Sequence, residues 1–502
     1  MRANQRRQFL RNTLLALPAA AFPHGRLFAA ADASIANDVE AVSGDGKQIL
    51  LKAADVRDFA ASLRGDLLVR DSAGYDSARH VWNGAFDRHP ALIARCTGAA
   101  DVMRAVGFAA SNHLLLSVRG GGHSLSGQSV CEKGLMIDLS QMNGVRVDPV
   151  RRIASVEGGA LLGALDRESL AHGLATTAGT VSHTGVGGLT LGGGFGRLGR
   201  RFGLTCDNLR SVDVVGADGK FLTASGQQNK DLFWGLRGGG GNFGVATSFD
   251  FQLHPVDPVM VGGELAYAWE DAPAVLKFFF ESAPQMPDEL NVDASLVRLP
   301  NDARFLTLDI CYCGPRDQAE RVIAPLRQIR KPMRDGVAAT PYAKLQSSGD
   351  AGLAHGRRYY IKGGFVQKYS PGLLEVAIAT ISEAKLPVVQ AVVFPQGGGA
   401  YKRVKPDATA FAQRAADHNV FLFNSWEDPA FNEPVAAWVR TNWAKVEPHT
   451  FGFYVNEFNA DDAARLRDTY GANFDRLVAL KTKYDPGNLF RLNANVAPKA
   501  RG

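Results

Sequence analysis

The sequence predicts an α+β protein with two lobes, and three observations lead to this fold class. With 502 residues, the chain exceeds what a single hydrophobic core ordinarily organises. Stretches with the period of a strand alternate with stretches of helical period up to about residue 255. After HPVDPV (254–259) the composition shifts and glycine becomes sparser. We therefore expect a glycine-rich lobe over residues 34–257 and a second lobe over residues 258–452.

The order of elements in the first lobe supports the α+β assignment. A short opening region of helix and loop is expected over 34–80. A hairpin is expected over 211–224, because Asp218 and Gly219 form a favoured two-residue turn. Other strands are expected at 114–120, 134–140 and 151–159, and a helix that ends at Gly173 is expected at 160–173.

The second lobe is predicted to contain strands with helices between them. RFLTLDICYC (304–313) and EVAIATI (375–381) are predicted to be strands. A last segment, 453–502, contains an amphipathic helix over 461–484 that is followed by DPGNLF (485–490). The sequence contains no internal repeat and no low-complexity tract.

Charge and cysteine content exclude several classes of function. The net charge is +6, but the charges are dispersed and form no basic stripe interleaved with aromatic residues. Nucleic-acid binding is therefore not expected. The five cysteines are an odd number, which argues against a complete disulfide framework. Cys311 and Cys313 form a C-x-C pair without a second pair, so we expect no metal site.

The first 33 residues resemble a twin-arginine export signal. Arg6 and Arg7 precede a modest apolar stretch over 13–22, and small residues suit cleavage near Ala31 or Ala33. This pattern predicts export to the periplasm. The apolar stretch is too short for a permanent membrane anchor. The alternative interpretation of residues 1–33 is a basic, partly helical tail.

Glycine clusters are the strongest chemical signal in the chain. RGGGHS (119–124) directly follows a predicted strand, and its backbone N–H groups can form a concavity that binds a pyrophosphate. It lacks the G-x-G-x-x-G pattern that opens a Rossmann helix. By itself, the motif also fits a glycine turn with a structural histidine.

Two further clusters make that alternative weaker. Residues 180–203 contain nine glycines among 24 residues, a composition that suits neither a packed helix nor a strand. A third cluster, GGGGNFGVAT, occupies 238–247. A chain wrapped around a flat ligand with phosphate groups would have this composition.

Together these motifs resemble a known family. RGGGHS, the GVGG-x-x-x-GGG-x-G stretch, LRGGGGNFGV (236–245) and the C-terminal YGANFDRL and KTKYDPGNLFRLN resemble berberine-bridge-enzyme-like oxidoreductases of the vanillyl-alcohol-oxidase superfamily. The resemblance covers about residues 75–498. It implies a two-lobed PCMH-type FAD-binding domain (34–257) with an inserted α/β substrate domain (258–452), which is an antiparallel sheet flanked by helices. Residues 453–502 should return to the FAD domain.

The resemblance implies that His123 bonds covalently to the 8α-methyl carbon of FAD. An imidazole nitrogen is a suitable nucleophile near neutral pH. By the same resemblance, residues near the pyrophosphate are Arg119, Gly120, Gly121, Gly122, Ser124 and Gly127. Residues along the flavin and ribityl chain are Gly179, Thr180, His183, Thr184, Gly185, Gly187 and Gly188. Asn242, Gly244 and Val245 lie near the adenine end, and Asn493 lies near the flavin. His183 is either structural or beside the isoalloxazine.

One departure from the family concerns the number of covalent links. Many relatives carry a second link through a cysteine four residues before GVGG, and this chain has Val181 there. We therefore expect a single link through His123. Doubly linked members often have open sites for sugars, so Val181 disfavours a bulky oligosaccharide as substrate.

The second departure concerns the catalytic base. Several relatives have a tyrosine where this chain has Glu457, and a carboxylate there could accept the substrate's proton. The alternative is an exposed glutamate at a strand end. Tyr454 and Tyr401 are further catalytic candidates, and Gln396 and Tyr359 are candidates for contact with substrate.

The sequence thus predicts an FAD-dependent oxidoreductase. The favoured form is an oxidase that moves a hydride from a small organic alcohol or amine to FAD, with O₂ as acceptor. The alternatives are a dehydrogenase that uses a quinone or a protein as acceptor and a flavin-binding protein without activity. Thr184 replaces the more usual valine at the position that controls oxygen access, so the choice between oxidase and dehydrogenase stays open.

Overall fold

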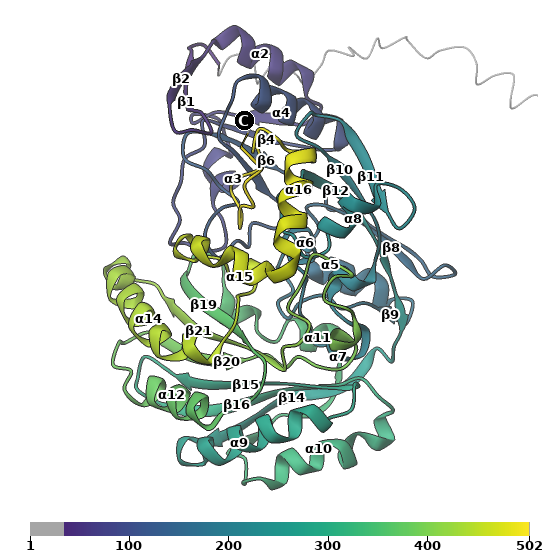
Figure 1. Cartoon of the computed structure of the whole chain (residues 1–502), viewed down its shortest axis with the longest axis vertical. Coiled ribbons are helices and arrows are strands. Elements are labelled where there is room, and N and C mark those ends of the chain that lie inside the picture. Colours follow the sequence, from purple (N-terminus) through teal and green to yellow (C-terminus); the bar gives the residue numbers. More distant parts are fainter. Residues whose placement is uncertain (1–34, 501–502) are drawn as a thin grey trace, which may run out of the picture.

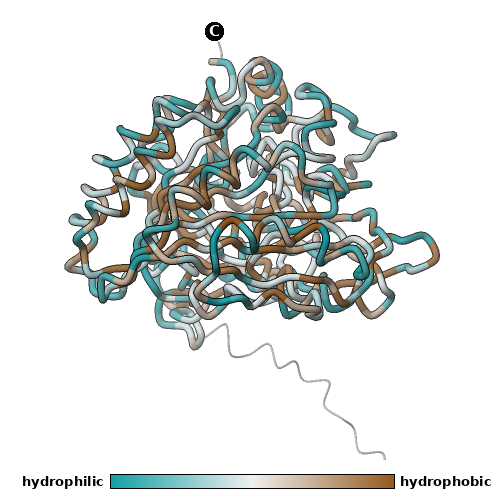
Figure 2. The backbone as a smooth tube through the Cα atoms, turned by 90° about the horizontal axis from the view of Figure 1, so that it is seen from below, coloured by the Kyte–Doolittle hydropathy of each residue, from teal (hydrophilic) through white to brown (hydrophobic). Residues whose placement is uncertain are grey.

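The computed structural model describes residues 35–500, which form an α+β protein built on several sheets (Figure 1). The predicted export signal lies outside the described residues. Apolar and polar residues alternate over short stretches of the chain, as elements with one buried face require (Figure 2). No helix of the described part is long and apolar enough to cross a membrane.

The glycine-rich lobe begins with a small mixed sheet. Its strands β4, β6 and β5 are parallel, and β3 pairs with β4 in the antiparallel sense. The strands of this region are β1 (Val39–Val42), β2 (Gln48–Leu51), β3 (Asp66–Leu68), β4 (Leu92–Arg95), β5 (Leu116–Arg119) and β6 (Leu135–Asp138). The helices are α2 (Ala53–Ser62), α3 (Tyr75–Arg79) and α4 (Ala99–Ser111). The strands predicted at 114–120 and 134–140 are confirmed, whereas the opening region contains three short strands that were not expected.

A five-stranded antiparallel sheet completes this lobe, in the order β11-β10-β12-β8-β7. Its strands are β7 (Val145–Asp148), β8 (Ile153–Glu157), β10 (Leu209–Val215), β11 (Phe221–Ser225) and β12 (Val245–Gln252). The helices are α5 (Leu162–Leu170), α6 (Val186–Leu191), α7 (Gly199–Phe202) and α8 (Lys230–Gly235), and β9 (Leu174–Ala175) pairs with β13 (His254–Pro255). The hairpin with the turn at Asp218 and Gly219 and the helix after residue 160 are confirmed.

The second lobe is one large antiparallel sheet, in the order β17-β14-β16-β15-β20-β21-β19, with β18 paired to β14. Its strands are β14 (Val259–Ala268), β15 (Leu290–Arg298), β16 (Arg304–Tyr312), β17 (Arg334–Asp335), β18 (Ala338–Pro341), β19 (Arg358–Val366), β20 (Val389–Phe394) and β21 (His418–Trp426). Its helices are α9 (Ala272–Ser282), α10 (Ala319–Gln328), α11 (Tyr342–Gln346), α12 (Pro371–Ser382), α13 (Ala400–Arg403) and α14 (Asn432–Val446). The antiparallel sheet with flanking helices is as predicted.

This sheet has two chemically different faces. Along β15, Val292, Ala294 and Leu296 join the apolar core formed with α9, α10, α12 and α14. Those helices lie on the side of the sheet away from the glycine-rich lobe (Figure 1). The alternate residues Asn291 and Asp293 line a cavity instead. The polar face of the sheet therefore faces the first lobe.

The strand predicted at EVAIATI is wrong, because these residues form the second half of helix α12. Ser370 caps the helix by accepting a hydrogen bond from the Leu373 N–H, and Pro371 occupies the first turn. Leu373, Ala377 and Ile381 are buried at helical spacing. The β-branched residues favour a strand only locally, and the cap together with the 3.6-residue burial pattern outweighs that preference.

The C-terminal segment returns to the first lobe, where α16 lies near α8 (Figure 1). The single helix predicted over 461–484 is wrong. Gly471, with φ of +48°, separates α15 (Leu466–Tyr470) from α16 (Phe474–Tyr484). Within α16, the buried Lys481 ammonium donates to the Asn242 and Phe490 carbonyl oxygens and pairs with Asp485.

Arginines at the end of the second glycine cluster join the two lobes. The Arg197 guanidinium pairs with Asp309 of β16 at 2.5 Å. Arg200 donates to the Gly397 and Met286 carbonyl oxygens, and Arg201 donates to the Cys313 carbonyl oxygen. Arg197 and Arg200 are each 4% exposed.

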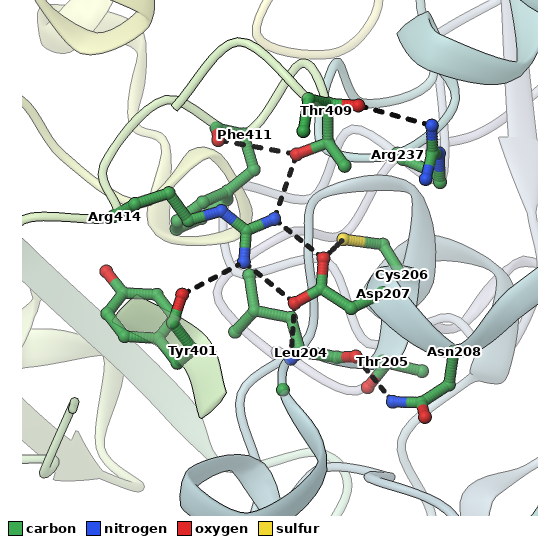
Figure 3. A network of polar contacts seen from close by, with 12 residues as sticks. Leu204, Thr205, Cys206, Asp207, Asn208, Arg237, Tyr401, Thr409, Phe411 and Arg414 are labelled. Atoms are coloured by element: carbon green, nitrogen blue, oxygen red, sulfur yellow. Dashed lines mark hydrogen bonds and ion pairs between the residues drawn. The ribbon is translucent and has the colours of Figure 1, made fainter. Parts of the chain in front are cut away.

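A buried ion pair between Arg414 and Asp207 fastens the lobes from the other side. Figure 3 shows the Arg414 guanidinium facing the Asp207 carboxylate, with both N–O distances at 2.7 Å. The same guanidinium donates to Thr409 Oγ1 at 2.9 Å, and Asp207 also accepts the Leu204 N–H. The two side chains are 1% and 9% exposed, so water competes little with either partner.

Replacing Arg414 with methionine should destabilise the protein by about 3–5 kcal/mol, because Asp207 then remains buried without its partner. The double variant Asp207→Asn, Arg414→Met should recover part of this loss, since no unpaired charge remains. Unfolding midpoints in denaturant measure both effects. Equal midpoints for the single and double variants would contradict the assigned cause.

Candidate functional site

The three glycine clusters meet around one cavity of about 440 Å³. The first cluster follows β5, the second begins helix α6, and the third precedes β12. Each cluster is therefore a loop at the end of a regular element, and the three loops face the same space. Ligand cavities in proteins have about this size.

Two of these loops touch backbone to backbone, which requires glycine. A methyl group on Gly121 would lie 2.4 Å from Gly185 Cα, closer than real carbon contacts allow. Gly122 has φ of +67°, a conformation that glycine adopts without strain. By contrast, Gly188 lines the cavity with no atom near its missing side chain. The glycines thus allow the loops to approach each other closely and leave free space in the cavity that they line.

The cavity carries buried polar atoms whose partners are not supplied by the described residues. They are His123 Nε2, Ser129 Oγ and Asn493 Oδ1. Buried polar groups in native proteins almost always have hydrogen-bond partners. Such atoms in a glycine-walled cavity fit a large ligand with its own polar groups, as FAD has.

His123 is held by aromatic stacking at one end of this cavity. Its ring lies 4.1 Å from the Trp82 ring, and Trp82 lies 3.8 Å from the Tyr359 ring on its other side. Burial, with the nearby His183 and His355, lowers the pKa of His123 to about 3. The imidazole is therefore neutral at pH 7, which is the nucleophilic form.

A second cavity of about 650 Å³ lies between the polar face of the large sheet and the glycine-rich lobe. Its sheet wall is hydrophilic and includes Asn291, Asp293, Ser295, Thr307 and Asp309. The two cavities adjoin each other, because their walls share Val181, Thr184, Leu189, Leu353, Phe421, Tyr454 and Glu457. A ligand in one cavity can thus meet a ligand in the other.

Glu457 lies at this junction and is oriented by one neighbour. The Asn419 amide of β21 donates to both Glu457 carboxylate oxygens, at 3.0 and 3.1 Å. Burial raises the pKa of Glu457 to about 8, although the Asn419 hydrogen bonds act in the opposite direction. A methyl group on Gly363 would lie 2.4 Å from Glu457 Oε2, so β19 leaves room for the carboxylate. A carboxyl group with such a pKa can gain or lose a proton near neutral pH.

The two candidate tyrosines have different environments. The Tyr454 hydroxyl accepts hydrogen bonds from the Gly194 N–H at 3.0 Å and from Asn456 Nδ2 at 2.8 Å. The Tyr401 hydroxyl donates to the Gln413 carbonyl oxygen. Burial raises the pKa of both tyrosines. Tyr454 lines both cavities. Tyr401 lines only the second cavity, and its hydroxyl proton is used in the hydrogen bond to Gln413.

The two candidate substrate residues are also placed differently from each other. Gln396 lines the second cavity, but its Oε1 accepts the Val292 N–H and braces β15. Tyr359 lines neither cavity. Its hydroxyl donates to the Ala354 carbonyl oxygen at 2.7 Å, and its ring supports Trp82 from behind.

The predicted cofactor residues fall into three groups. Those that line the first cavity are Gly120, Gly121, Gly122, His123, Ser124, Thr184, Gly185, Gly187, Gly188, Gly244, Val245 and Asn493. Gly179 and Thr180 line the second cavity. Arg119, Gly127, His183 and Asn242 line neither. A methyl group on Gly127 would meet the Phe86 ring, and the Asn242 amide binds the C-terminal segment through the Ala494 carbonyl oxygen.

Several residues of the site carry no signal in the sequence. Trp82 and Asn419 lie outside every motif, and they reach the site only through the packing of distant strands and loops. Gln128 and Ser129 follow the first motif and also line the first cavity. Their place just after RGGGHS is the one hint that the sequence offered.

Other chemistry is not apparent in the described part. All five cysteines are buried and unpaired. Over residues 35–500, no group of His, Cys, Asp and Glu side chains is arranged to hold a metal ion.

Two family models match the chain. The FAD binding domain model matches residues 90–225, and the berberine and berberine-like model matches residues 453–497. The first region contains two of the three glycine clusters, and the second contains Tyr454, Glu457 and Asn493.

Known proteins match nearly the whole chain. An FAD-linked oxidoreductase of Dictyostelium discoideum is 31% identical over 88% of this chain and 97% of its own. The crystal structure of 6-hydroxy-D-nicotine oxidase from Arthrobacter nicotinovorans aligns with a TM-score of 0.79 and 28% identity, over 87% of this chain and 99% of that one. Glucooligosaccharide oxidase from Acremonium strictum, whose FAD is described as 6-S-cysteinyl, 8α-N1-histidyl, shares the fold (TM-score 0.80, 24% identity, 89% of this chain and 100% of that one).

The fold, the glycine-walled cavity and these matches agree with one another, and the resemblance inferred from the motifs is confirmed. The chain belongs to the berberine-bridge-enzyme-like FAD-linked oxidoreductases of the vanillyl-alcohol-oxidase superfamily.

Proposed function

We propose that this FAD-dependent oxidoreductase is an oxidase of small organic alcohols or amines, with O₂ as the electron acceptor and FAD bound covalently through His123 alone. The observation that carries the proposal is the position of Glu457. Its side chain lies in the wall that the second cavity shares with the glycine-walled one, and the Asn419 amide donates a hydrogen bond to its carboxylate.

FAD fits the first cavity, and the residues that line it have distinct tasks. The three glycine loops hold the pyrophosphate and the ribityl chain, and Asn493 and Ser129 offer polar atoms to the ligand. His123 provides a neutral ring nitrogen for attachment. Bound FAD supplies a two-electron acceptor for the hydride of the substrate. Val181 lines both cavities where a cysteine would be needed for a second link, and a valine side chain cannot form one.

The remaining chemistry belongs to the protein. Glu457 takes the proton from the substrate hydroxyl or amino group as the hydride leaves, and Asn419 fixes its orientation. The Tyr454 oxygen already accepts two hydrogen bonds, so its remaining polar contact is the O–H that it can donate to substrate.

The second cavity indicates the size and polarity of the substrate. About 650 Å³ accommodates a molecule of small to moderate size, and 6-hydroxy-D-nicotine, the substrate in the name of one relative, is such a molecule. The hydroxyl, amide and carboxylate groups on the sheet wall can bind hydroxyl or amino groups away from the reacting carbon.

We also propose that the protein is exported to the periplasm. The paired Arg6 and Arg7 and the small residues before position 34 support transport of the folded protein by the twin-arginine route. That route suits a protein that acquires its cofactor before export.

Anaerobic mixing with a panel of alcohols and amines tests the proposed activity. A substrate should bleach the flavin absorbance, and admission of air should restore it rapidly with formation of H₂O₂. Bleaching that persists in air would support a dehydrogenase instead. Absence of bleaching across the panel would favour a flavin-binding protein without activity.

The covalent link predicts a simple separation experiment. Acid-precipitated wild-type protein should remain yellow, and digestion should give one flavin-bearing peptide that contains His123. The His123→Ala variant should leave its flavin in the supernatant. Release of FAD from wild-type protein, or a flavin adduct on another residue, would contradict the single link.

The role of Glu457 predicts both a rate and a pH profile. A base acts in its ionised form, and burial raises the pKa of Glu457 to about 8. The rate of anaerobic flavin reduction should therefore increase with pH up to about 8 and level off above it. Glu457→Gln should lower this rate about 10²- to 10⁴-fold and abolish the dependence. Glu433→Gln, on the exposed face of α14, is the matched control and should behave like wild type. A Glu457→Gln variant with an unchanged pH profile would exclude this residue as the base.

A further inference from the structure

Three histidines connect the attachment position to the protein surface. The His123 and His183 ring centroids lie 5.1 Å apart, and the His183 and His355 centroids lie 4.9 Å apart. His123 and His183 are half-buried, and His355 is exposed. Both ring nitrogens of His183 are buried and have no hydrogen-bond partner among residues 35–500. The three neighbouring rings thus lead from the half-buried His123 to the exposed His355.

The segment before His355 is fastened to the loop that carries His183. The Asp350 carboxylate accepts hydrogen bonds from the Ser182 N–H at 3.0 Å and from Ser182 Oγ at 2.5 Å. Ser182 directly precedes His183. These contacts bring a segment of the second lobe to the histidine of the first lobe.

The segment around His355 is also fastened to Trp82 and its neighbours. The Trp82 indole N–H donates to the Leu353 carbonyl oxygen at 2.6 Å, and the Gly356 N–H donates to the Trp82 carbonyl oxygen at 3.0 Å. The Gly84 N–H donates to the Arg357 carbonyl oxygen at 2.8 Å. Because the chain is anchored on both sides of His355, its ring is held near His183.

Formation of the covalent link releases protons at a buried point. A ring nitrogen of His123 bonds to the 8α-carbon of FAD, while one N–H bond of His123 and one C–H bond of the methyl group break. The two electrons of the C–H bond remain on the flavin, and a two-electron acceptor such as dioxygen later removes them. The reduced flavin takes up one of the two protons, and the other must leave the region of the new N–C bond, where burial disfavours charge. A path for protons is therefore required at this end of the cavity.

The protonation states of His355 and His123 suit such a path. Burial, His183 and Arg119 lower the pKa of His355, and burial also lowers the pKa of His123. Near pH 7 each of these rings is neutral, with one nitrogen that donates and one that accepts. Rotation about the terminal side-chain torsion of a histidine is soft, so rings at these separations can exchange a proton along their edges.

We propose that His183 and His355 form a proton relay that carries protons from His123 to solvent while FAD becomes covalently attached. The proposal rests on the single link through His123 proposed above. His183 and His355 act through His123 and are positioning residues for attachment, and they have no assigned part in substrate oxidation. No single motif contains all three, because the relay is assembled from both lobes.

The rate of attachment tests the relay directly. Apoprotein from riboflavin-depleted cells is mixed with FAD, and acid-stable flavin is measured over time. His355→Ala should slow attachment about 10²-fold, a magnitude typical for loss of one proton-transfer group. Free imidazole should restore the rate, because His355 is exposed and a small molecule can occupy its place. His172→Ala, which removes another exposed histidine, should attach FAD at the wild-type rate.

A variant of the inner ring provides a second measurement. His183→Gln should also slow attachment but should respond little to imidazole, since the ring nitrogens of His183 are buried. Reversible FAD binding, followed by flavin fluorescence, should be unchanged in His355→Ala. If His183→Gln fails to fold, the imidazole response of His355→Ala decides alone.

The outcomes separate this inference from the proposed function. Attachment of FAD to His355→Ala at the wild-type rate, or slow attachment that imidazole does not restore, would overturn the relay. Release of FAD from denatured wild-type protein would instead overturn the covalent link itself.

Discussion

The distance between the two lobes is the constraint on which both cavities depend, and buried charged contacts fix it. Arg414 with Asp207 on one side and Arg197 with Asp309 on the other cross from one lobe to the other with almost no exposure of the arginines. Such contacts tolerate little change in separation, because each arginine has given up water for its partner. The lobes therefore meet at a defined spacing, and the space between them has a defined shape.

The second requirement is a sheet whose two faces differ. Alternate residues of β15 and β16 belong either to the apolar core with the helices or to the polar wall of the second cavity. In many antiparallel sheets one face packs on the core and the polar face is exposed to solvent. Here the glycine-rich lobe covers it, so hydroxyl, amide and carboxylate groups are kept for a ligand. Glu457 reaches the same space from the start of the C-terminal segment, where it lies against Gly363 of β19 and Asn419 of β21.

Much of the fold and part of the site could be predicted from the sequence. The glycine clusters were informative because close backbone approach, as between Gly121 and Gly185, excludes every other residue type. The hairpin at Asp218 and the strand before RGGGHS follow from local patterns. EVAIATI was misassigned because its composition favours a strand, whereas the cap at Ser370 and the packing of Ile381 decide for a helix.

The rest of the site depends on contacts between distant parts of the chain. Trp82 supports His123, and Asn419 orients Glu457, yet neither residue differs locally from an ordinary core or strand residue. His355 lies near His183 only because Asp350 and Trp82 hold its segment against the first lobe. Such roles arise from tertiary packing, which the sequence pattern of one segment does not contain.

The most direct test of the account is a crystal structure of the flavin-loaded protein with a substrate or a substrate analogue. We predict that the ligand occupies the second cavity and that its hydroxyl or amino group lies within hydrogen-bond distance of Glu457, about 3 Å. Its reacting carbon should face the flavin where the two cavities join. A ligand whose reacting group lies away from Glu457 would contradict the account, as would a flavin outside the cavity that the three glycine clusters form.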